Sequence, residues 1–129
     1  MCDDGTHCSH HPGRGLIQLE ILRILYETPA HGYRIMDDLR KSTSDEYAPE
    51  PGAIYTMLRR LEQRSLVASR WEKKESGADR RVYTITREGR EFLEEGLQMV
   101  KRRRQLMDGL VRFYEDNFEG KKPRRRRGL

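Results

Sequence analysis

Apolar residues recur with helical spacing in three segments of the first half of the chain. The first runs from about Leu16 to Glu27, the second covers residues 32–42, and the third covers residues 52–64. Steps of three and four residues place these apolar positions on one face of a helix. The side chains expected to point inward are Ile35, Met36 and Leu39 in the second segment and Ile54, Leu58 and Leu61 in the third. PAHG, residues 29–32, is interpreted as the turn between the first two helices.

The next segment alternates between apolar and polar positions, which is the period of a strand. It runs from Leu66 to Trp71, reaches a Ser-Gly-Ala-Asp turn at residues 76–79, and resumes as a second strand rich in Val, Tyr, Thr and Ile. This pattern predicts a β-hairpin. Three short helices followed by a hairpin predict a mainly α fold with a winged helix-turn-helix domain over residues 16–86.

A single long helix is predicted over residues 87–119, and it carries a heptad seam. Its apolar positions follow alternating steps of four and three residues, with Arg104 in the one polar slot. They are Leu93, Leu97, Val100, Met107, Val111, Tyr114 and Phe118. At the rise of a helix the seam is roughly 38 Å long, which exceeds the roughly 30 Å breadth of a domain of about 90 residues. The far half therefore needs a partner, and we expect this helix to form a homodimer.

The length and composition of the chain restrict its number of domains and its location in the cell. A chain of 129 residues is long enough for one domain with one core. No stretch is apolar for long enough to cross a membrane, and the N-terminus lacks the basic and then apolar pattern of a secretion signal. The sequence therefore predicts a cytoplasmic protein without membrane contact.

The net charge of +5 comes from one end of the chain. Six of the 26 Lys and Arg residues follow Glu119, in KKPRRRRGL, and the other 20 nearly balance the 21 acidic residues. Residues 1–15 and 120–129 are too polar to pack, so we expect both tails to be disordered. The basic tail would add salt-dependent affinity for DNA, and a solubilising end is the alternative.

The third predicted helix has an outward flank that is not a simple Glu/Lys mixture. Helical geometry sends five side chains to the side opposite its apolar stripe, namely Tyr55, Thr56, Arg59, Arg60 and Gln63. Arginine can bind guanine, glutamine can pair with adenine, and Thr and Tyr can contact phosphates or thymine methyl groups. Gly52 and Ala53 would let a phosphate approach the free N–H groups of the first turn. A solvated basic face is the alternative, and the helix alone does not decide between them.

The predicted hairpin carries a second basic group around its turn. It consists of Lys73, Lys74, Arg80 and Arg81, with Glu75 and Asp79 between them. A wing of this kind can lie along a phosphate backbone or enter the minor groove, although a soluble hairpin tip has the same composition. Two basic patches on neighbouring elements favour double-stranded DNA as the partner.

Three blocks of the sequence resemble the PadR family of transcriptional regulators. They are HGYRIMDDL, PGAIYTMLRRLEQRSLV and RRVYTITREGREFL, in the order and spacing of that family between about Leu19 and Leu97. The resemblance implies a winged-helix DNA-binding domain, a C-terminal helix that dimerises, and DNA near Tyr33, Tyr55 and the basic wing residues. The family typically has Gly in the turn after the third helix, where this chain has Ser65.

The resemblance also implies a role in the cell. Members of the family usually act as repressors, and some respond to small aromatic or drug-like molecules bound between subunits. A small-molecule inducer is therefore a candidate partner and Trp71 a candidate ligand-binding residue, although a lone Trp at a strand end is more often part of the core. We expect a homodimer that binds an inverted repeat, with its third helices in major grooves roughly 34 Å apart.

Cysteine and histidine gather near the N-terminus, at Cys2, His7, Cys8, His10 and His11. Thiolate and imidazole are ligands that zinc prefers, and four of them would complete a tetrahedral site. A metal- or redox-responsive tail is one interpretation. The spacing matches no compact zinc finger, so a disordered tail with no required cofactor is the other.

Other functional classes have less support in the sequence. No nucleophile lies near His31 in a recognisable motif, and there is no phosphate loop or paired-carboxylate pattern, so we predict that the chain is not an enzyme. A winged helix that serves as a protein-interaction module within a transcription complex would keep the same fold and dimer. The basic residues shared by the third helix and the wing favour DNA over that alternative.

Overall fold

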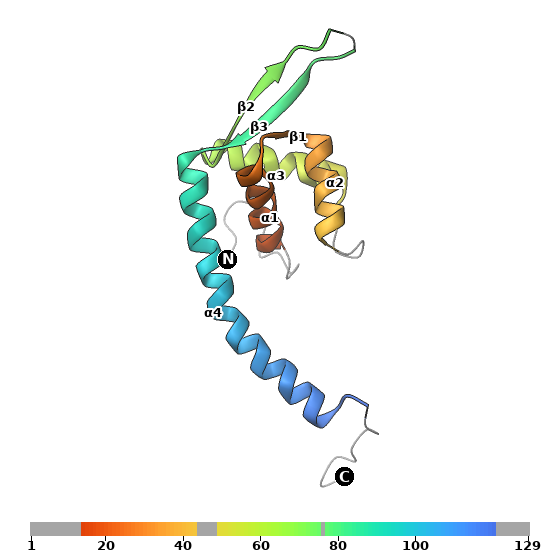
Figure 1. Cartoon of the computed structure of the whole chain (residues 1–129), viewed down its shortest axis with the longest axis vertical. Helices are drawn as coiled ribbons and strands as arrows, with labels where there is room; N and C mark the ends of the chain where they lie inside the picture. Colours follow the sequence, from red (N-terminus) through yellow and green to blue (C-terminus); the bar gives the residue numbers. More distant parts are fainter. Residues whose placement is uncertain (1–13, 44–48, 76, 121–129) are drawn as a thin grey trace. The chain divides into compact units, whose positions relative to one another are not determined.

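The computed structural model describes residues 14–43, 49–75 and 77–120 of the chain. Its elements are α1 (Arg14–Glu27), β1 (Ala30–His31), α2 (Gly32–Ser42), α3 (Pro51–Gln63), β2 (Val67–Glu72), β3 (Arg80–Ile85) and α4 (Arg87–Asn117). The predicted fold class is confirmed, because three helices, a hairpin and a long C-terminal helix follow in the predicted order (Figure 1). The chain divides into two compact units, one up to Glu95 and one from Gly96 onward. Within the described ranges, no helix combines the length and the apolar run that crossing a membrane requires.

β2 and β3 form the predicted hairpin, and β1 adds a third antiparallel strand beside β3. Ala30 pairs with Tyr83, and His31 pairs with Val82. The interpretation of residues 29–32 as a turn alone was wrong, because a two-residue strand is too short for an alternating pattern to show. Since His31 is also the N-cap residue of α2, β1 joins the start of that helix to the hairpin.

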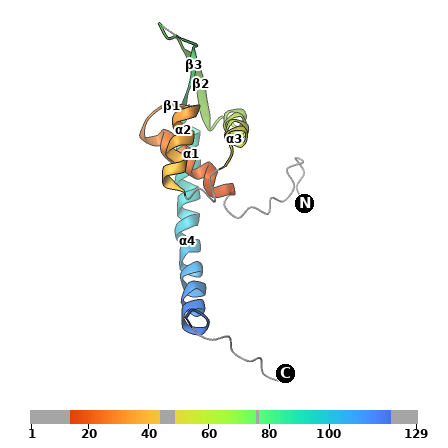
Figure 2. The ribbon, with the colours of Figure 1, turned by 90° about the vertical axis from the view of Figure 1, so that its right-hand side faces the viewer.

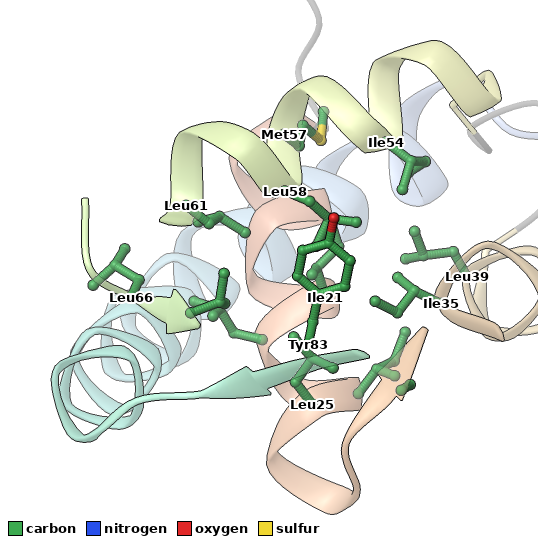
Figure 3. Packing of buried hydrophobic residues seen from close by; sticks show 14 of the residues in the cluster. Ile21, Leu25, Ile35, Leu39, Ile54, Met57, Leu58, Leu61, Leu66 and Tyr83 are labelled. Carbon is green, nitrogen blue, oxygen red and sulfur yellow. The ribbon is translucent and has the colours of Figure 1, made fainter. Parts of the chain in front are cut away.

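The core of the first unit lies between α1, α2, α3 and the sheet. Figure 3 shows apolar side chains from these helices packed around Tyr83 of β3. The predicted inward positions are confirmed, because five of them are at most 1% exposed and the sixth, Met36, packs against the same cluster. The five are Ile35, Leu39, Ile54, Leu58 and Leu61. Burial of this face of α3 turns its other flank away from the core.

α3 ends in a tight turn that contains a left-handed residue. Ser65 has a φ of 62°, its N–H donates to the carbonyl of Glu62 at 3.0 Å, and the N–H of Leu66 donates to the carbonyl of Leu61 at 2.9 Å. These two bonds form a Schellman motif, which usually has glycine at the left-handed position. Serine therefore adopts here the conformation for which the PadR pattern uses glycine.

The same turn holds the beginning of α4. The hydroxyl of Thr86 donates to the carbonyl of Ser65 at 2.7 Å and accepts the N–H of Gly89 at 2.9 Å, which caps the helix. A Cβ at Gly89 would overlap the carbonyl oxygen of Leu66. Glycine permits this close approach, and one turn further along α4 Leu93 enters the core with 5% exposure.

Candidate nucleic-acid interface

The outward flank of α3 is accessible to a partner. Arg59 and Gln63 are exposed, Tyr55 is 43% exposed, and Thr56 and Arg60 are half-buried. Neither arginine forms an ion pair with another residue in the part of the chain that the structure describes. Both positive charges are therefore uncompensated by a direct partner there.

The first turn of α3 is open. Gly52 and Ala53 are exposed, and the N-cap residue Glu50 makes no side-chain hydrogen bond to this turn. The hydroxyl of Thr56 donates to the carbonyl of Gly52 at 3.0 Å, so it offers a ligand only its acceptor lone pairs. The first turn thus has backbone N–H groups without a side-chain cap, which is the arrangement that attracts anions.

Two exposed tyrosines lie where α2 begins and along α3. Tyr33 is 69% exposed, and it directly follows the buried Gly32. The ring of Tyr55 packs over Gly32, because its Cε1 lies 2.6 Å from the place of a Cβ there. This contact brings the outward flank of α3 next to the start of α2.

The hairpin of β2 and β3, called the wing from here on, carries basic residues in two different environments. Lys73 and Lys74 are exposed near its tip. Arg80 is half-buried, with Nη1 3.1 Å from Nε2 of His31 and Nη2 3.5 Å from Oε1 of Glu72. Its Nε is buried and has no hydrogen-bond partner among the described residues. Arg80 therefore connects the wing to β1, whereas the lysines face solvent.

Arg81 is anchored to α3. Its Nε donates to Oγ of Ser69 at 2.8 Å, and its Nη2 lies 3.5 Å from Oε1 of Glu62. Oγ of Ser69 in turn donates to Oε2 of Glu62 at 2.8 Å. No local sequence pattern links these three residues, because they come from α3, β2 and β3. Together they tie the hairpin to α3.

Trp71 lies opposite Arg81 in the hairpin and is 65% exposed. The interpretation of this residue as ordinary core is therefore wrong, since the side chain projects beyond the buried part of the sheet. Its role in binding a ligand stays a prediction.

His31 lies between α2 and the wing. Its Nδ1 accepts the N–H of Arg34 at 3.4 Å, while its Nε2 faces Arg80. A neutral imidazole has one acceptor nitrogen, so it can accept only one of these donors at a time. Burial lowers the pKa of His31, and neighbouring charges add to that effect. The charges that lower it belong to Arg80, Lys74 and Arg34, and Glu72 acts in the opposite direction.

In the second unit, α4 exposes the apolar side chains of the predicted seam. Six of the seven seam residues are between 37% and 57% exposed, namely Leu97, Val100, Met107, Val111 and Tyr114 in α4 and Phe118 directly after it. Leu93 differs, because it is buried in the core of its own chain and is not available to a partner. The role of the other six in dimerisation stays a prediction.

A second apolar row lies beside this seam. Met99, Leu106, Leu110 and Phe113 are between 46% and 68% exposed, and helical geometry places them on an adjacent strip of α4. These four residues lie outside the predicted heptad seam, so the seam pattern did not reveal this row. The two rows make an apolar face wider than the seam of a two-stranded coiled coil, and a large exposed apolar patch is typical of an interaction surface.

Both predicted tails contain residues that lie outside the described ranges. These include the predicted zinc ligands Cys2, His7, Cys8, His10 and His11, and the run of arginines after Pro123. The zinc site and the contribution of the basic tail to DNA affinity stay predictions.

The helices α1 to α3 with the β2–β3 wing define a winged helix-turn-helix protein. The chain belongs to the PadR family, because the family described as "Transcriptional regulator PadR-like family" matches residues 21–95. The family consists of transcriptional regulators rather than enzymes, which agrees with the prediction made from the sequence.

Comparison with individual proteins agrees with this assignment. "Transcriptional regulator YqjI" of Escherichia coli (strain K12) is 34% identical over 89 residues, which cover 69% of this chain but only 41% of YqjI. A transcriptional regulator of solved structure from Thermoplasma acidophilum is 34% identical, with a TM-score of 0.67 over 75% of this chain and 91% of that chain. Bacillus subtilis PadR, solved in complex with operator DNA, shares the fold with a TM-score of 0.58 at 21% identity, over 64% of this chain and 46% of that chain.

Proposed function

We propose that this regulator binds double-stranded DNA with α3 in the major groove and the wing on the phosphate backbone or in the minor groove. The observation that supports this most is the exposed flank of Tyr55, Arg59 and Gln63 on a helix whose opposite side is fixed in the core. Arginine and glutamine have the hydrogen-bonding groups to read guanine and adenine edges. Bacillus subtilis PadR, which has the same fold, is bound to operator DNA in its structure.

Local cations would provide the attraction, since the charge of the body is nearly balanced. Arg59 and Arg60 on α3 and Lys73 and Lys74 on the wing bring positive charge to adjoining elements. Each phosphate that they neutralise would release counterions, so affinity would fall steeply as salt is added. The alternative is that the same flank docks on another protein. In that case we expect no linear fall of the logarithm of affinity with the logarithm of salt concentration, because no counterions are released from DNA.

The proposed assembly is a homodimer formed through α4. Its two exposed apolar rows would be removed from water by a second copy, and each Å² covered contributes about 25 cal/mol. A twofold dimer presents two α3 helices to DNA, which suits an inverted repeat with half-sites roughly 34 Å apart.

We propose repression as the outcome, because a dimer bound near a promoter excludes other proteins from that stretch of DNA. A small molecule bound between subunits would act by changing the distance between the two α3 helices. Zinc bound by the N-terminal cysteines and histidines would offer a second route of regulation, and the DNA-binding fold itself would require no cofactor. The protein would act in the cytoplasm.

The test replaces both Arg59 and Arg60 by Ala. The charge-matched control replaces Arg40 of α2 and Arg90 of α4, which are exposed and lie off the proposed interface. The probe is a duplex selected from a randomised pool by the unaltered protein, and affinity is measured over a salt series. The α3 variant should lose about a hundredfold or more in affinity, since each base contact of this type contributes about 1–3 kcal/mol. If both variants bind equally, α3 does not read DNA and the protein-docking alternative takes its place.

A further inference from the structure

Trp71, the only tryptophan of the chain, lies against a cation on the wing. Cζ of Arg81 is 5.7 Å from the centroid of the Trp71 ring and 6.0 Å from that of Tyr83. Both distances are within the range of a cation–π interaction, and such contacts are stronger with Trp than with other aromatic residues. A single exposed aromatic residue is common on protein surfaces, but this one flanks an arginine that is itself fixed in place.

Hydrogen bonds hold Arg81 from one side and leave the other side open. Ser69 and Glu62 take up two of its five N–H groups, and the remaining three have no partner among the described residues. The side chain nevertheless stays 46% exposed. A planar guanidinium that is already ordered suits bidentate contact with a phosphate and loses little conformational entropy when it binds.

This cluster lies on the side of the hairpin that faces α3. Successive side chains of a strand point to opposite faces, so Ser69 and Trp71 share one face and Arg81, paired with Trp71, joins them. The bond from Ser69 to α3 identifies that face, and Figure 2, which turns the hairpin nearly edge-on, shows α3 beside it. Arg81 also lies over the ring of Tyr83 and is bound to Glu62 of α3. Arg81 and Trp71 therefore lie in a corner between the wing and α3, the helix that carries Arg59.

We infer that Trp71 and Arg81 form an element that binds the sugar–phosphate backbone of DNA in this corner. Arg81 binds phosphate oxygens, and the ring of Trp71 packs against the adjoining deoxyribose. Glu62 and Ser69 are positioning residues that keep the guanidinium in place. The inference rests on the proposed DNA binding, and it gives Trp71 a nucleic-acid contact in place of the small-molecule role suggested by the family resemblance.

Emission from Trp71 gives a direct readout, because no other tryptophan contributes to it. The full chain is titrated at low salt with a labelled mixed-sequence duplex, and tryptophan emission and duplex anisotropy are followed together. Emission should be quenched with the same half-saturation as the anisotropy change and should recover when salt releases the duplex. Acrylamide should also reach the ring less easily in the complex. Full binding by anisotropy with unchanged emission and unchanged acrylamide quenching would show that Trp71 lies away from DNA.

A pair of matched variants tests Arg81. Arg70 is exposed on the same hairpin but points to the opposite face, so Arg70→Ala removes an equal charge without touching the corner. Arg81→Ala should lower affinity about tenfold and reduce the slope of log affinity against log salt by about one per protomer. Arg70→Ala should leave that slope unchanged.

Variants of Trp71 separate stacking from charge. Trp71→Ala should lower affinity about threefold to fivefold, because it removes the platform for the guanidinium. Trp71→Phe retains an aromatic ring, so its affinity should be close to that of the unaltered protein. Because this position is exposed, a side chain that only filled space would not need to be aromatic. Equal affinities for the unaltered, Ala and Phe proteins would overturn the role of this ring.

Two results separate this inference from the proposed function on which it rests. If replacing Arg59 and Arg60 abolishes duplex binding while Arg81→Ala and Trp71→Ala behave like Arg70→Ala, the inference is wrong and the function stands. If the unaltered chain shows no salt-dependent binding to the duplex, both are wrong.

Discussion

The ring of Tyr55 occupies the space that a Cβ at Gly32 would need. That Cβ would lie 2.6 Å from Cε1 and 2.9 Å from the hydroxyl oxygen of Tyr55. Gly32 begins α2, whereas Tyr55 belongs to the outward flank of α3. Because Gly32 has no Cβ, the ring of Tyr55 can take this position on the flank proposed to contact DNA.

Gly32→Ala should weaken DNA binding with little loss of stability. The new methyl group displaces the end of a flexible side chain rather than backbone, and Ala is a better helix former than Gly. Affinity for the selected duplex should fall about fivefold, which corresponds to about 1 kcal/mol, while the midpoint of urea unfolding stays nearly constant. In a Tyr55→Ala background the same replacement should have no further effect on affinity. A fully additive loss would show that Tyr55 is not the link.

Gly89→Ala should destabilise the first unit strongly. The added Cβ would overlap the carbonyl oxygen of Leu66, so the backbone of α4 or of the turn after α3 must move. We expect the free energy of unfolding to fall by about 3 kcal/mol in urea titrations. Gly109→Ala on the same helix is the control, because no atom of the described residues lies within 4 Å of its Cβ position, and it should gain up to about 1 kcal/mol. Similar effects at both positions would contradict the close approach to Leu66.

The stability of the fold should decrease as the pH falls below the usual pKa of histidine. Burial, together with neighbouring positive charges, lowers the pKa of His31 from its ordinary value of 6.5. Below about pH 6.5 the unfolded chain binds a proton at His31 while the folded chain resists it, so the free energy of unfolding falls. At higher pH both states are neutral at this residue and the contribution is constant.

His31→Asn provides the comparison for this prediction. Asn cannot titrate but can still accept the N–H of Arg34 as an N-cap residue. Urea midpoints of the two proteins should run in parallel above about pH 7.5 and diverge below about pH 6, with the unaltered protein losing more. Parallel curves down to about pH 5 would show that His31 is no source of pH dependence.

Charged replacements in the α4 seam should produce monomers. Val111→Glu and Tyr114→Glu each place a carboxylate on the exposed apolar face, where pairing with a second copy would bury it at high cost. Sedimentation velocity should show half the mass of the unaltered protein at the same concentration. Gln105→Glu adds the same charge on the side of α4 away from both apolar rows and should leave the dimer intact. A dimer that survives both seam replacements would move the interface elsewhere.

The elements of this fold could be predicted because burial follows directly from periodicity. Ile54, Leu58 and Leu61 recur at helical steps, and a helix has only one way to bury them together. α4 likewise begins at the predicted residue, Arg87. The turn after α3 was harder, since serine gives no sign that Ser65 must adopt a left-handed conformation.

The details of the interface depend on contacts between distant segments, which sequence patterns do not contain. Counting basic residues could not show that Arg80 faces His31 or that Arg81 is bound to Glu62. Both pairings arise only after the hairpin packs beside α2 and α3. The burial of Leu93 has the same origin, because the heptad pattern alone does not show which of its positions is buried in the core of the first unit.

The measurement that tests the central claim most directly is the base preference conferred by α3. Duplexes are selected from a randomised pool with the unaltered protein and with Arg59→Ala, Gln63→Ala and Lys73→Ala variants. The unaltered protein should recover a symmetric site with half-sites about 10 base pairs apart. Each α3 replacement should relax the preference at one base of each half-site, whereas the wing replacement should lower affinity without changing the preference. Recovery of the same site by all four proteins, with equal preference at every base, would contradict the claim that α3 reads DNA.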